Sequence, residues 1–285
     1  MKLVRFGQKG FERPGLIADD GTIRDLSHII ADIAGYSLRP EGLERIARVE
    51  PESLPRAPSD ARLGACIAMP YNFVAIGLNY ADHAEEANLP IPEEPIIFSK
   101  APTAISGPYD DVILPPGSKK GDWEVELGIV IGSPCDNVSE ANALDYVAGY
   151  CICNDVSERE FQIEMAGQWV KGKSAPTFGP VGPWLVTKDE IPDVQNLAMY
   201  LDLNGERMQT GNTNTMIFGV VEIVAYVSRF MALLPGDIII TGTPPGVGLG
   251  MKPPHYLKAG DEMVLGIEGL GEQRQKVVAH PLDQA

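Results

Sequence analysis

The chain has 285 residues, and its 23 Lys and Arg against 39 Asp and Glu give a net charge of −16. Hydrophobic residues at 44% and charged residues at 22% are typical of a folded globular protein and exclude a disordered chain. The negative charge disfavours nucleic acid and anionic membranes as partners. It also predicts that an acidic substrate needs a local cation, either a basic side chain or a bound metal.

The sequence indicates no targeting signal or membrane segment. Residues 1–15 lack the apolar stretch of a signal peptide. Segment 63–81 is uncharged over a membrane-spanning length, but its Gly, Pro and Asn residues favour a loop and a buried strand. The four cysteines are interpreted as buried free thiols of a cytoplasmic protein, with a metal or redox pair at Cys151 and Cys153 as the alternative.

Two units are predicted along the chain: a small N-terminal domain with its linker at 1–62, and a larger domain at 63–285. In the first unit, alternation at 2–6 predicts a strand, and 25–35 predict a short helix. The proline-rich, polar residues 51–61 are typical of a linker.

The larger unit is predicted to be mostly β, because strand patterns alternate with Gly, Pro, Asn and Asp. These patterns lie at 73–80, 95–100, 111–116, 124–132, 149–157, 183–187, 197–208, 237–243 and 261–271. Two helices are predicted among them, at 140–148 with Ser139 as cap and at 216–234 with an apolar stripe. Turns at 235–237 and 259–261 precede β-rich runs, which favours hairpins of a rolled sheet or barrel.

The sharpest chemical feature is a pair of glutamates, Glu124 and Glu126, in an apolar strand pattern. On a strand they project from one face with Cα atoms about 6.6 to 6.8 Å apart. A second apolar strand ends in Asp155. Three carboxylates suit a hard cation such as Mg²⁺, because oxygen ligands and water complete its shell. The alternative from spacing alone is a solvated sheet face with glutamates pointing at water.

His83 stands beside several acids in NYADHAEE, residues 79–86. If this segment is helical, His83 and Glu86 share a face, and the carboxylate can fix the imidazole tautomer and raise its basicity. Such a pair can remove a proton from water. The alternative is a surface histidine without a chemical role.

Two loops contain further candidate residues. Lys171 and Lys173 lie in a predicted Gly- and Pro-containing loop, where they could bind a carboxylate or stabilise an enolate. This loop lacks the glycine spacing of a Walker A motif. A second loop at 241–248, TGTPPGVG, follows a predicted strand, and its small residues allow backbone N–H groups to approach a ligand.

Taken together, five motifs resemble the fumarylacetoacetate hydrolase family over roughly residues 70–280. In sequence order they are NYADHAEE, DWEVELGIVIG, GYCICNDVSEREFQ, KGKSAPTFGPVGPW and TGTPPGVG. The resemblance implies an α+β, mostly β fold: a mixed β-roll with a small N-terminal α+β domain. It also implies an enzyme.

The resemblance assigns a metal site. It implies that Glu124, Glu126 and Asp155 are the protein ligands of Mg²⁺ or Mn²⁺. Lys173 matches the lysine that faces the metal-bound oxyanion. Arg159 corresponds to a residue that supports the ligands from outside their shell.

The resemblance also assigns the substrate side. His83 and Glu86 match a lid segment that closes over substrate and activates water. Gln162 and Thr243 match positions that hold a small-molecule 2-oxo acid. The implied assembly is a homodimer, with a tetramer as the alternative.

Within the family, GPWLVT, LAMYLDLNGERMQTGNT and LGIEGLGEQRQ resemble bacterial members of nonphosphorylative L-rhamnose and L-fucose breakdown. Those members hydrolyse a C–C bond of 2,4-didehydro-3-deoxy-L-rhamnonate, or of the fuconate compound, to pyruvate and L-lactate. Ureidoglycolate lyase, oxaloacetate decarboxylase and diketo-acid isomerase are alternatives on the same scaffold. A non-catalytic module that binds a metal or partner is the alternative from another class.

Overall fold

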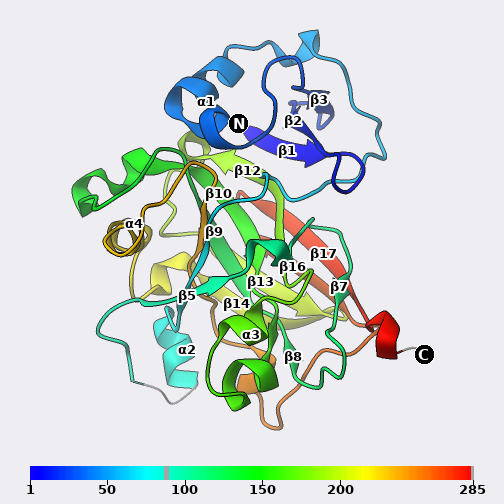
Figure 1. The fold of residues 1–285 in the computed structure, drawn as a ribbon, viewed down its shortest axis with the longest axis vertical. Helices are drawn as coiled ribbons and strands as arrows, with labels where there is room; N and C mark the ends of the chain where they lie inside the picture. The colour runs from blue at the N-terminus through cyan, green and yellow to red at the C-terminus, as the bar shows by residue number, and fades with distance from the viewer. Residues whose placement is uncertain (87–89, 284–285) are drawn as a thin grey trace.

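The computed structural model describes residues 1–86 and 90–283, without the side chains of His83 and Glu86. Strands dominate it, which confirms the predicted fold class (Figure 1). The largest sheet in this described chain has ten strands. In spatial order they are β3 (Ile23–Asp25), β2 (Arg13–Ile17), β1 (Lys2–Phe6), β12 (Gly179–Thr187), β10 (Val147–Asn154), β9 (Val125–Ile131), β15 (Ile238–Ile240), β4 (Phe73–Gly77) and β5 (Ile96–Lys100), with β6 (Ile105–Ser106) beside β12.

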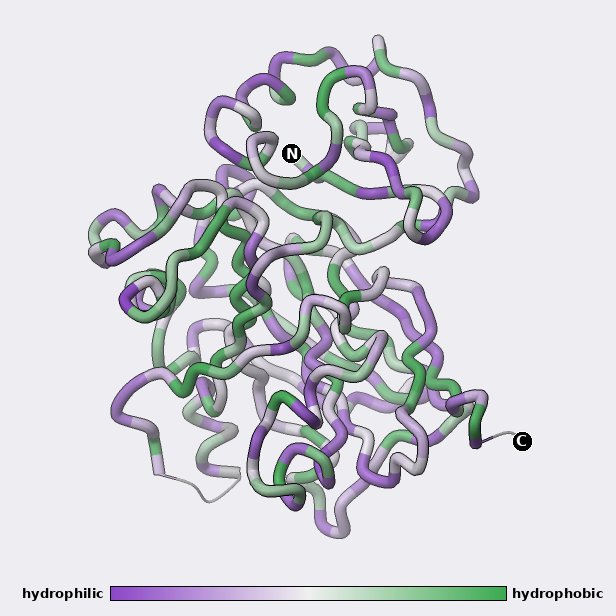
Figure 2. The backbone as a smooth tube through the Cα atoms, in the orientation of Figure 1, coloured by the Kyte–Doolittle hydropathy of each residue, from purple (hydrophilic) through white to green (hydrophobic). Residues whose placement is uncertain are grey.

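A second sheet packs against the first. In order its strands are β14 (Glu206–Asn212), β13 (Ala198–Leu203), β16 (Glu262–Ile267), β17 (Gly271–Val278) and β7 (Val112–Ile113). A short pair joins β11 (Ser157–Glu158) to β8 (Gly121–Asp122). Strand β9 contacts both β13 and β16, and apolar side chains from these strands form one core. Figure 2 shows apolar stretches along the central strands and polar ones on many outer loops.

The burial of each strand explains its sequence pattern. All residues of β9 and β10 are buried, so these strands are continuous apolar runs rather than alternating ones. In β17 buried and exposed residues alternate, because one face meets solvent. The hairpin of β16 and β17 agrees with the rolled C-terminal region predicted from the turns.

The N-terminal strands extend the large sheet. Strand β1 pairs antiparallel with β12, with Leu3 opposite Leu185. The division into units at 1–62 and 63–285 stays a prediction. The helix predicted at 25–35 is wrong, because Asp25 accepts a hydrogen bond from the backbone N–H of Ser27 and turns the chain instead.

The helices are shorter than the periodicity predicts. The α-helices are α1 (Pro40–Ala47), α2 (Ala81–Glu86), α3 (Val170–Lys173) and α4 (Val220–Ser228). Short 3₁₀ segments are η1 (Gly35–Leu38), η2 (Pro51–Ser53), η3 (Pro102–Ala104), η4 (Glu140–Tyr146), η6 (Lys188–Glu190), η7 (Thr213–Thr215), η8 (Gly248–Gly250) and η9 (Pro281–Asp283), and η5 (Glu160–Glu164) is a π-helical turn.

Two helix predictions need correction at their ends. The helix predicted at 216–234 begins only at Val220, because Asn79 binds the backbone N–H groups of Ile217 and Phe218. The helix predicted at 140–148 is the 3₁₀ segment η4, and the side chain of Ser139 forms no capping hydrogen bond. Its last two predicted residues belong to β10 instead.

Two further sequence predictions concern cysteines and membranes. All four cysteines are free and buried, as predicted. No helix within 1–86 and 90–283 is long and apolar enough to cross a membrane.

Candidate metal centre and pocket

Three buried carboxylates meet where β9 and β10 lie side by side. Glu124 immediately precedes β9, Glu126 lies within it, and Asp155 follows β10. Antiparallel pairing places Asn154 opposite Val125, and the backbone N–H of Asp155 donates to the carbonyl of Glu124 at 2.9 Å. One oxygen from each carboxylate lies within 4.8 Å of the others. The structure therefore brings together the three predicted ligands on one buried face.

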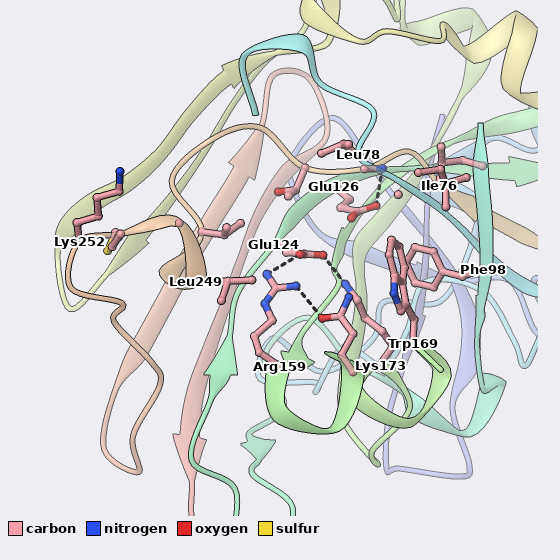
Figure 3. Close-up of a pocket in the computed structure, with 18 residues that line it drawn as sticks. Ile76, Leu78, Phe98, Glu124, Glu126, Arg159, Trp169, Lys173, Leu249 and Lys252 are labelled. Atoms are coloured by element: carbon pink, nitrogen blue, oxygen red, sulfur yellow. Dashed lines mark hydrogen bonds and ion pairs between the residues drawn. The ribbon is translucent and has the colours of Figure 1, made fainter. Parts of the chain in front are cut away.

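Three cationic side chains hold two of these carboxylates. Nζ of Lys173 lies 2.6 Å from Oε2 of Glu124 and 2.6 Å from Oδ2 of Asp155. Nζ of Lys100 donates to Oδ1 of Asp155 at 2.5 Å. Nη2 of Arg159 donates to Oε1 of Glu124 at 2.7 Å (Figure 3). Every carboxylate oxygen of Glu124 and Asp155 thus accepts one charge-assisted hydrogen bond.

The pKa values of the centre follow from this arrangement. Burial alone would raise the pKa of Glu124, but Lys173 and Arg159 lower it to about 2. Burial likewise opposes the charge on Lys173, yet Asp155 and Glu124 raise its pKa above the ordinary value. Both side chains therefore remain ionised at neutral pH.

Glu126 has a different environment. Its Oε2 accepts a hydrogen bond from the backbone N–H of Gly242 at 2.8 Å. Among the residues whose side chains are described, no Lys or Arg forms an ion pair with it. Burial, followed by repulsion from Asp155 and Glu124, raises the pKa of Glu126 well above its usual range.

This donor set fits a divalent cation. Each oxygen that accepts one hydrogen bond keeps a second lone pair for a ligand bond. An added cation would offset the repulsion that raises the pKa of Glu126. Among the described side chains this cluster has three carboxylates and neither cysteine nor histidine, which favours Mg²⁺ or Mn²⁺ over softer metals.

Lys100 and Asp122 also support this centre, although the sequence analysis did not single them out. Lys100 is the last residue of β5, and its burial, not its spacing, reveals its role. Oδ2 of Asp122 accepts from Nε of Arg159 at 2.7 Å, while its Oδ1 accepts from the backbone N–H of Gly248 at 2.7 Å. Its place just before the glutamate pair is the one signal that could have indicated it.

A pocket of about 530 Å³ opens onto two of the carboxylates, Glu124 and Glu126. Its polar and charged lining residues are Glu124, Glu126, Arg159, Gln162, Lys173, Thr243 and Lys252. The rest of its wall is Ile76, Gly77, Leu78, Ile96, Phe98, Trp169, Gly242, Val247, Leu249, Gly250 and Met251. Trp169 and Phe98 pack edge to face with ring centroids 5.1 Å apart beside Lys173 (Figure 3). Outside its ionic centre the pocket is therefore mostly apolar.

The two predicted substrate residues both line this pocket, and both have protein partners. Oε1 of Gln162 accepts from Nη1 of Arg159 at 3.0 Å. Oγ1 of Thr243 donates to the carbonyl of Val125 at 2.9 Å. Their roles in substrate binding stay predictions.

The two predicted lysines separate. Their segment is a helical turn, α3, rather than an open loop. Lys173 is buried at the carboxylates, whereas Nζ of Lys171 donates to the carbonyl of Met165 on the exposed side. Only Lys173 lines the pocket.

His83 and Glu86, the predicted water-activating pair, are described only in their backbone. Helix α2 confirms that the segment with His83 and Glu86 is helical. Their side chains lie outside the described part of the structure, so their role stays a prediction.

The chain is similar to known proteins over nearly its whole length. The family model "Fumarylacetoacetate (FAA) hydrolase C-terminal" matches residues 72–278. A Burkholderia multivorans protein with a provisional hydrolase name is 58% identical over 276 residues, which cover 96% of this chain and 98% of that protein. A fumarylacetoacetate hydrolase structure from Exiguobacterium antarcticum is 38% identical with a TM-score of 0.88, covering 98% of this chain and 100% of the other.

Two further solved structures differ in their named reactions. Maleylpyruvate hydrolase from Sphingobium sp. SYK-6, in complex with manganese(II) and pyruvate, is 30% identical with a TM-score of 0.82 and coverages of 98% and 99%. The 2-hydroxyhepta-2,4-diene-1,7-dioate isomerase from Mycobacterium marinum is 33% identical with a TM-score of 0.76 and coverages of 99% and 99%. Together with the matched motifs, these relationships show that the chain belongs to the fumarylacetoacetate hydrolase family of hydrolases and isomerases.

Proposed function

We propose that this protein is a metal-dependent hydrolase that cleaves the C3–C4 bond of a 2,4-diketo acid and releases pyruvate. The main support for this proposal is the buried triad of Glu124, Glu126 and Asp155. It lies beside Lys173, at a pocket of about 530 Å³. The Sphingobium hydrolase with manganese(II) and pyruvate supports a keto acid and a divalent metal in this fold.

The triad would hold Mg²⁺ or Mn²⁺. When bound, the ion supplies Lewis acidity toward the oxygens of a 2-oxo acid. Lys100 and Arg159 fix the carboxylates of Asp155 and Glu124, through hydrogen bonds of 2.5 and 2.7 Å. These partners orient the ligands before the metal arrives.

Lys173 and Arg159 supply the local positive charge that a chain of net charge −16 needs for an anionic substrate. The Lys173 ammonium can stabilise the enolate oxygen that develops as the C3–C4 bond breaks. Because Arg159 binds Oε1 of Gln162, the amide Nε2 is left as a donor for the substrate carboxylate.

Water activation is assigned to His83, with Glu86 fixing its tautomer. Helix α2 follows β4, and Ile76, Gly77 and Leu78 at the end of β4 line the pocket. His83 would remove a proton from a water molecule that adds to C4. Cleavage then gives a carboxylate from C4 and the pyruvate enolate from C3, which is protonated to pyruvate.

We further propose 2,4-didehydro-3-deoxy-L-rhamnonate as the substrate, with L-lactate as the second product. The matching stretches such as GPWLVT support this proposal. So does the wall of Phe98 and Trp169, because the C6 methyl group of a 6-deoxy sugar acid suits an apolar surface better than a hydroxymethyl group would.

Isomerisation of an unsaturated diketo acid is the second candidate. The Mycobacterium marinum isomerase favours it, because that protein matches 99% of this chain. An isomerase needs no attacking water and releases no pyruvate, so the products separate the two candidates.

The test is a substrate panel with the metal-loaded full-length protein. Pyruvate release is measured from the 2,4-diketo rhamnonate, its fuconate counterpart and oxaloacetate. Glyoxylate release is measured from ureidoglycolate, and isomerisation is followed in the ultraviolet spectrum of an unsaturated diketo acid. We expect equal amounts of pyruvate and L-lactate from a 2,4-diketo sugar acid, and loss of this activity with EDTA. Turnover confined to another substrate would overturn the proposal, and absence of any turnover or binding would favour a non-catalytic module.

A further inference from the structure

Gln209 of β14 is a fully buried amide that connects the second sheet to the carboxylate centre. Its Oε1 accepts a hydrogen bond from the backbone N–H of Val125 at 3.0 Å. Val125 stands between Glu124 and Glu126. This one bond therefore holds the backbone segment that carries both glutamates.

The other end of the same amide holds the loop at 241–248. Nε2 of Gln209 donates to Oγ1 of Thr243 and to the carbonyl of Pro244, each at 2.8 Å. Oγ1 of Thr243 in turn donates to the carbonyl of Val125 at 2.9 Å. Gln209, Thr243 and Val125 thus form a closed ring of hydrogen bonds, in which both backbone groups of Val125 have a side-chain partner.

Close packing leaves this loop little freedom. Gly246 has a φ of +101°, and a Cβ there would lie 1.9 Å from the carbonyl oxygen of Met208. The loop therefore lies directly against β14, next to Gln209. The same loop contributes the N–H of Gly242 that binds Glu126 at 2.8 Å.

We infer that Gln209 is a positioning residue of the carboxylate centre, because it fixes the Val125 backbone and the loop that binds Glu126. It does not line the pocket, so it acts through these groups rather than on a ligand. The inference rests on the proposed function in one respect, namely that the centre binds a metal. Residues that orient metal ligands from outside their shell typically change metal affinity by roughly 10- to 100-fold.

The experiment measures Mn²⁺ binding to the metal-free, full-length protein by the electron paramagnetic resonance signal of free Mn²⁺. Gln209→Met keeps a long buried side chain but removes the amide. Thr213→Val is the matched control, because Oγ1 of this buried residue accepts from the N–H of Leu197 and donates to the carbonyl of Val194, each at 2.8 Å. It directly follows β14, as the first residue of η7.

We expect Gln209→Met to weaken Mn²⁺ binding about tenfold or more, whereas Thr213→Val stays within about twofold of wild type. Both variants lose buried hydrogen bonds, so both should melt at a lower temperature. Only Gln209→Met should also speed hydrogen exchange at the amide of Val125 in the metal-free protein. This second measurement does not depend on metal or activity.

Thr243→Val removes the hydroxyl group that the loop contributes to the same ring of hydrogen bonds. This variant replaces Gln209→Met in the test if Gln209→Met does not fold. Combining the two substitutions should weaken Mn²⁺ binding by less than the product of the single effects, because both break one ring. If wild type binds Mn²⁺ and both single variants bind it within about twofold, the positioning role is overturned while the metal centre stands. If wild type binds no Mn²⁺, the proposed metal centre itself is wrong.

Discussion

Nζ of Lys100 lies 2.5 Å from Oδ1 of Asp155, and both side chains are fully buried. The same ammonium also donates to the carbonyl of Val156 at 3.3 Å and to the carbonyl of Lys173. Burial lowers the pKa of Lys100, although Asp155 opposes this effect. Lys100 therefore neutralises the charge of Asp155, one of the candidate ligands. It also connects Asp155 to helix α3, which ends at Lys173.

Replacing Lys100 with Met should strongly destabilise the protein. Asp155 keeps its bond to Lys173 but loses the partner of its Oδ1, and removal of one partner from a buried ion pair typically costs about 3–5 kcal/mol. Urea unfolding of the metal-free protein measures this loss. Lys252→Met is the control, because this exposed lysine at the pocket rim should change the free energy of unfolding by less than about 0.5 kcal/mol. Equal stabilities of the two variants would contradict the role of Lys100.

Glu126→Gln should stabilise the metal-free protein and weaken metal binding. A neutral amide avoids the cost of burying a charge, and it also avoids the repulsion from Asp155 and Glu124; together these effects raise the pKa of Glu126. The same change removes a charged oxygen ligand, so Mn²⁺ affinity should fall by about 100-fold or more, beyond the range for residues outside the ligand shell. Calorimetry with EDTA and with Mn²⁺ measures both effects. If the metal-free variant were less stable than wild type, other groups would have to neutralise the charge of Glu126 in the folded state.

The raised pKa of Glu126 also predicts a pH dependence. Above pH 4.5, its ordinary value, the folded state holds this proton more tightly than the unfolded state. The resulting stabilisation is complete below that pH and is lost as pH rises through the raised pKa, by at most about 1.4 kcal/mol per pH unit. In EDTA, wild type should therefore lose stability relative to Glu126→Gln as pH rises. A difference in unfolding free energy that does not change with pH would contradict the raised pKa of Glu126. Saturating Mg²⁺ should abolish this pH dependence.

Lys173 and Lys171 form a matched pair for catalysis. Lys173→Met should reduce kcat by about 10²- to 10³-fold, because it removes a donor for developing negative charge. Lys171→Met should leave kcat unchanged, since its ammonium binds a carbonyl outside the pocket. Steady-state kinetics with the best substrate of the panel decides between them. Similar kcat values for both variants would remove Lys173 from the mechanism.

We expect Trp169 to contact the acyl end of the substrate, which is the part from C4 onward, and so to influence which substrates are accepted. Trp169→Ala should reduce kcat/KM about tenfold or more for a diketo acid with an apolar terminus. Gly77→Ala should have a similar effect, because a Cβ there would lie 2.6 Å from Cζ3 of Trp169 and displace the ring. Val170→Ala is the control, since this half-exposed neighbour is absent from the pocket wall. Unchanged selectivity in both pocket variants would place the acyl end elsewhere.

The predicted homodimer is tested by sedimentation of the full-length protein. A mass of twice 30.8 kDa would support it, and a single-chain mass would contradict it. A fourfold mass would favour the alternative tetramer.

Local pattern predicted strands better than helices. The apolar runs at 124–132 and 149–157 became β9 and β10 because burial on both faces requires such runs. The predicted helix at 25–35 failed, because the Asp25 side chain formed a turn that periodicity does not detect. The predicted start of helix α4 failed for a tertiary reason, since Asn79 lies far away in sequence and yet binds the residues before it.

The candidate ligands could be found from the sequence because their chemistry is encoded locally. Glu124 and Glu126 are two residues apart, and strand geometry alone places them on one face. Tertiary structure alone decided that Lys100 and Gln209 support these ligands as well. Lys100 is 55 residues from Asp155, and Gln209 is 84 residues from Val125. No local spacing encodes such contacts, because they arise only when separate strands pack and buried polar groups must find partners away from water.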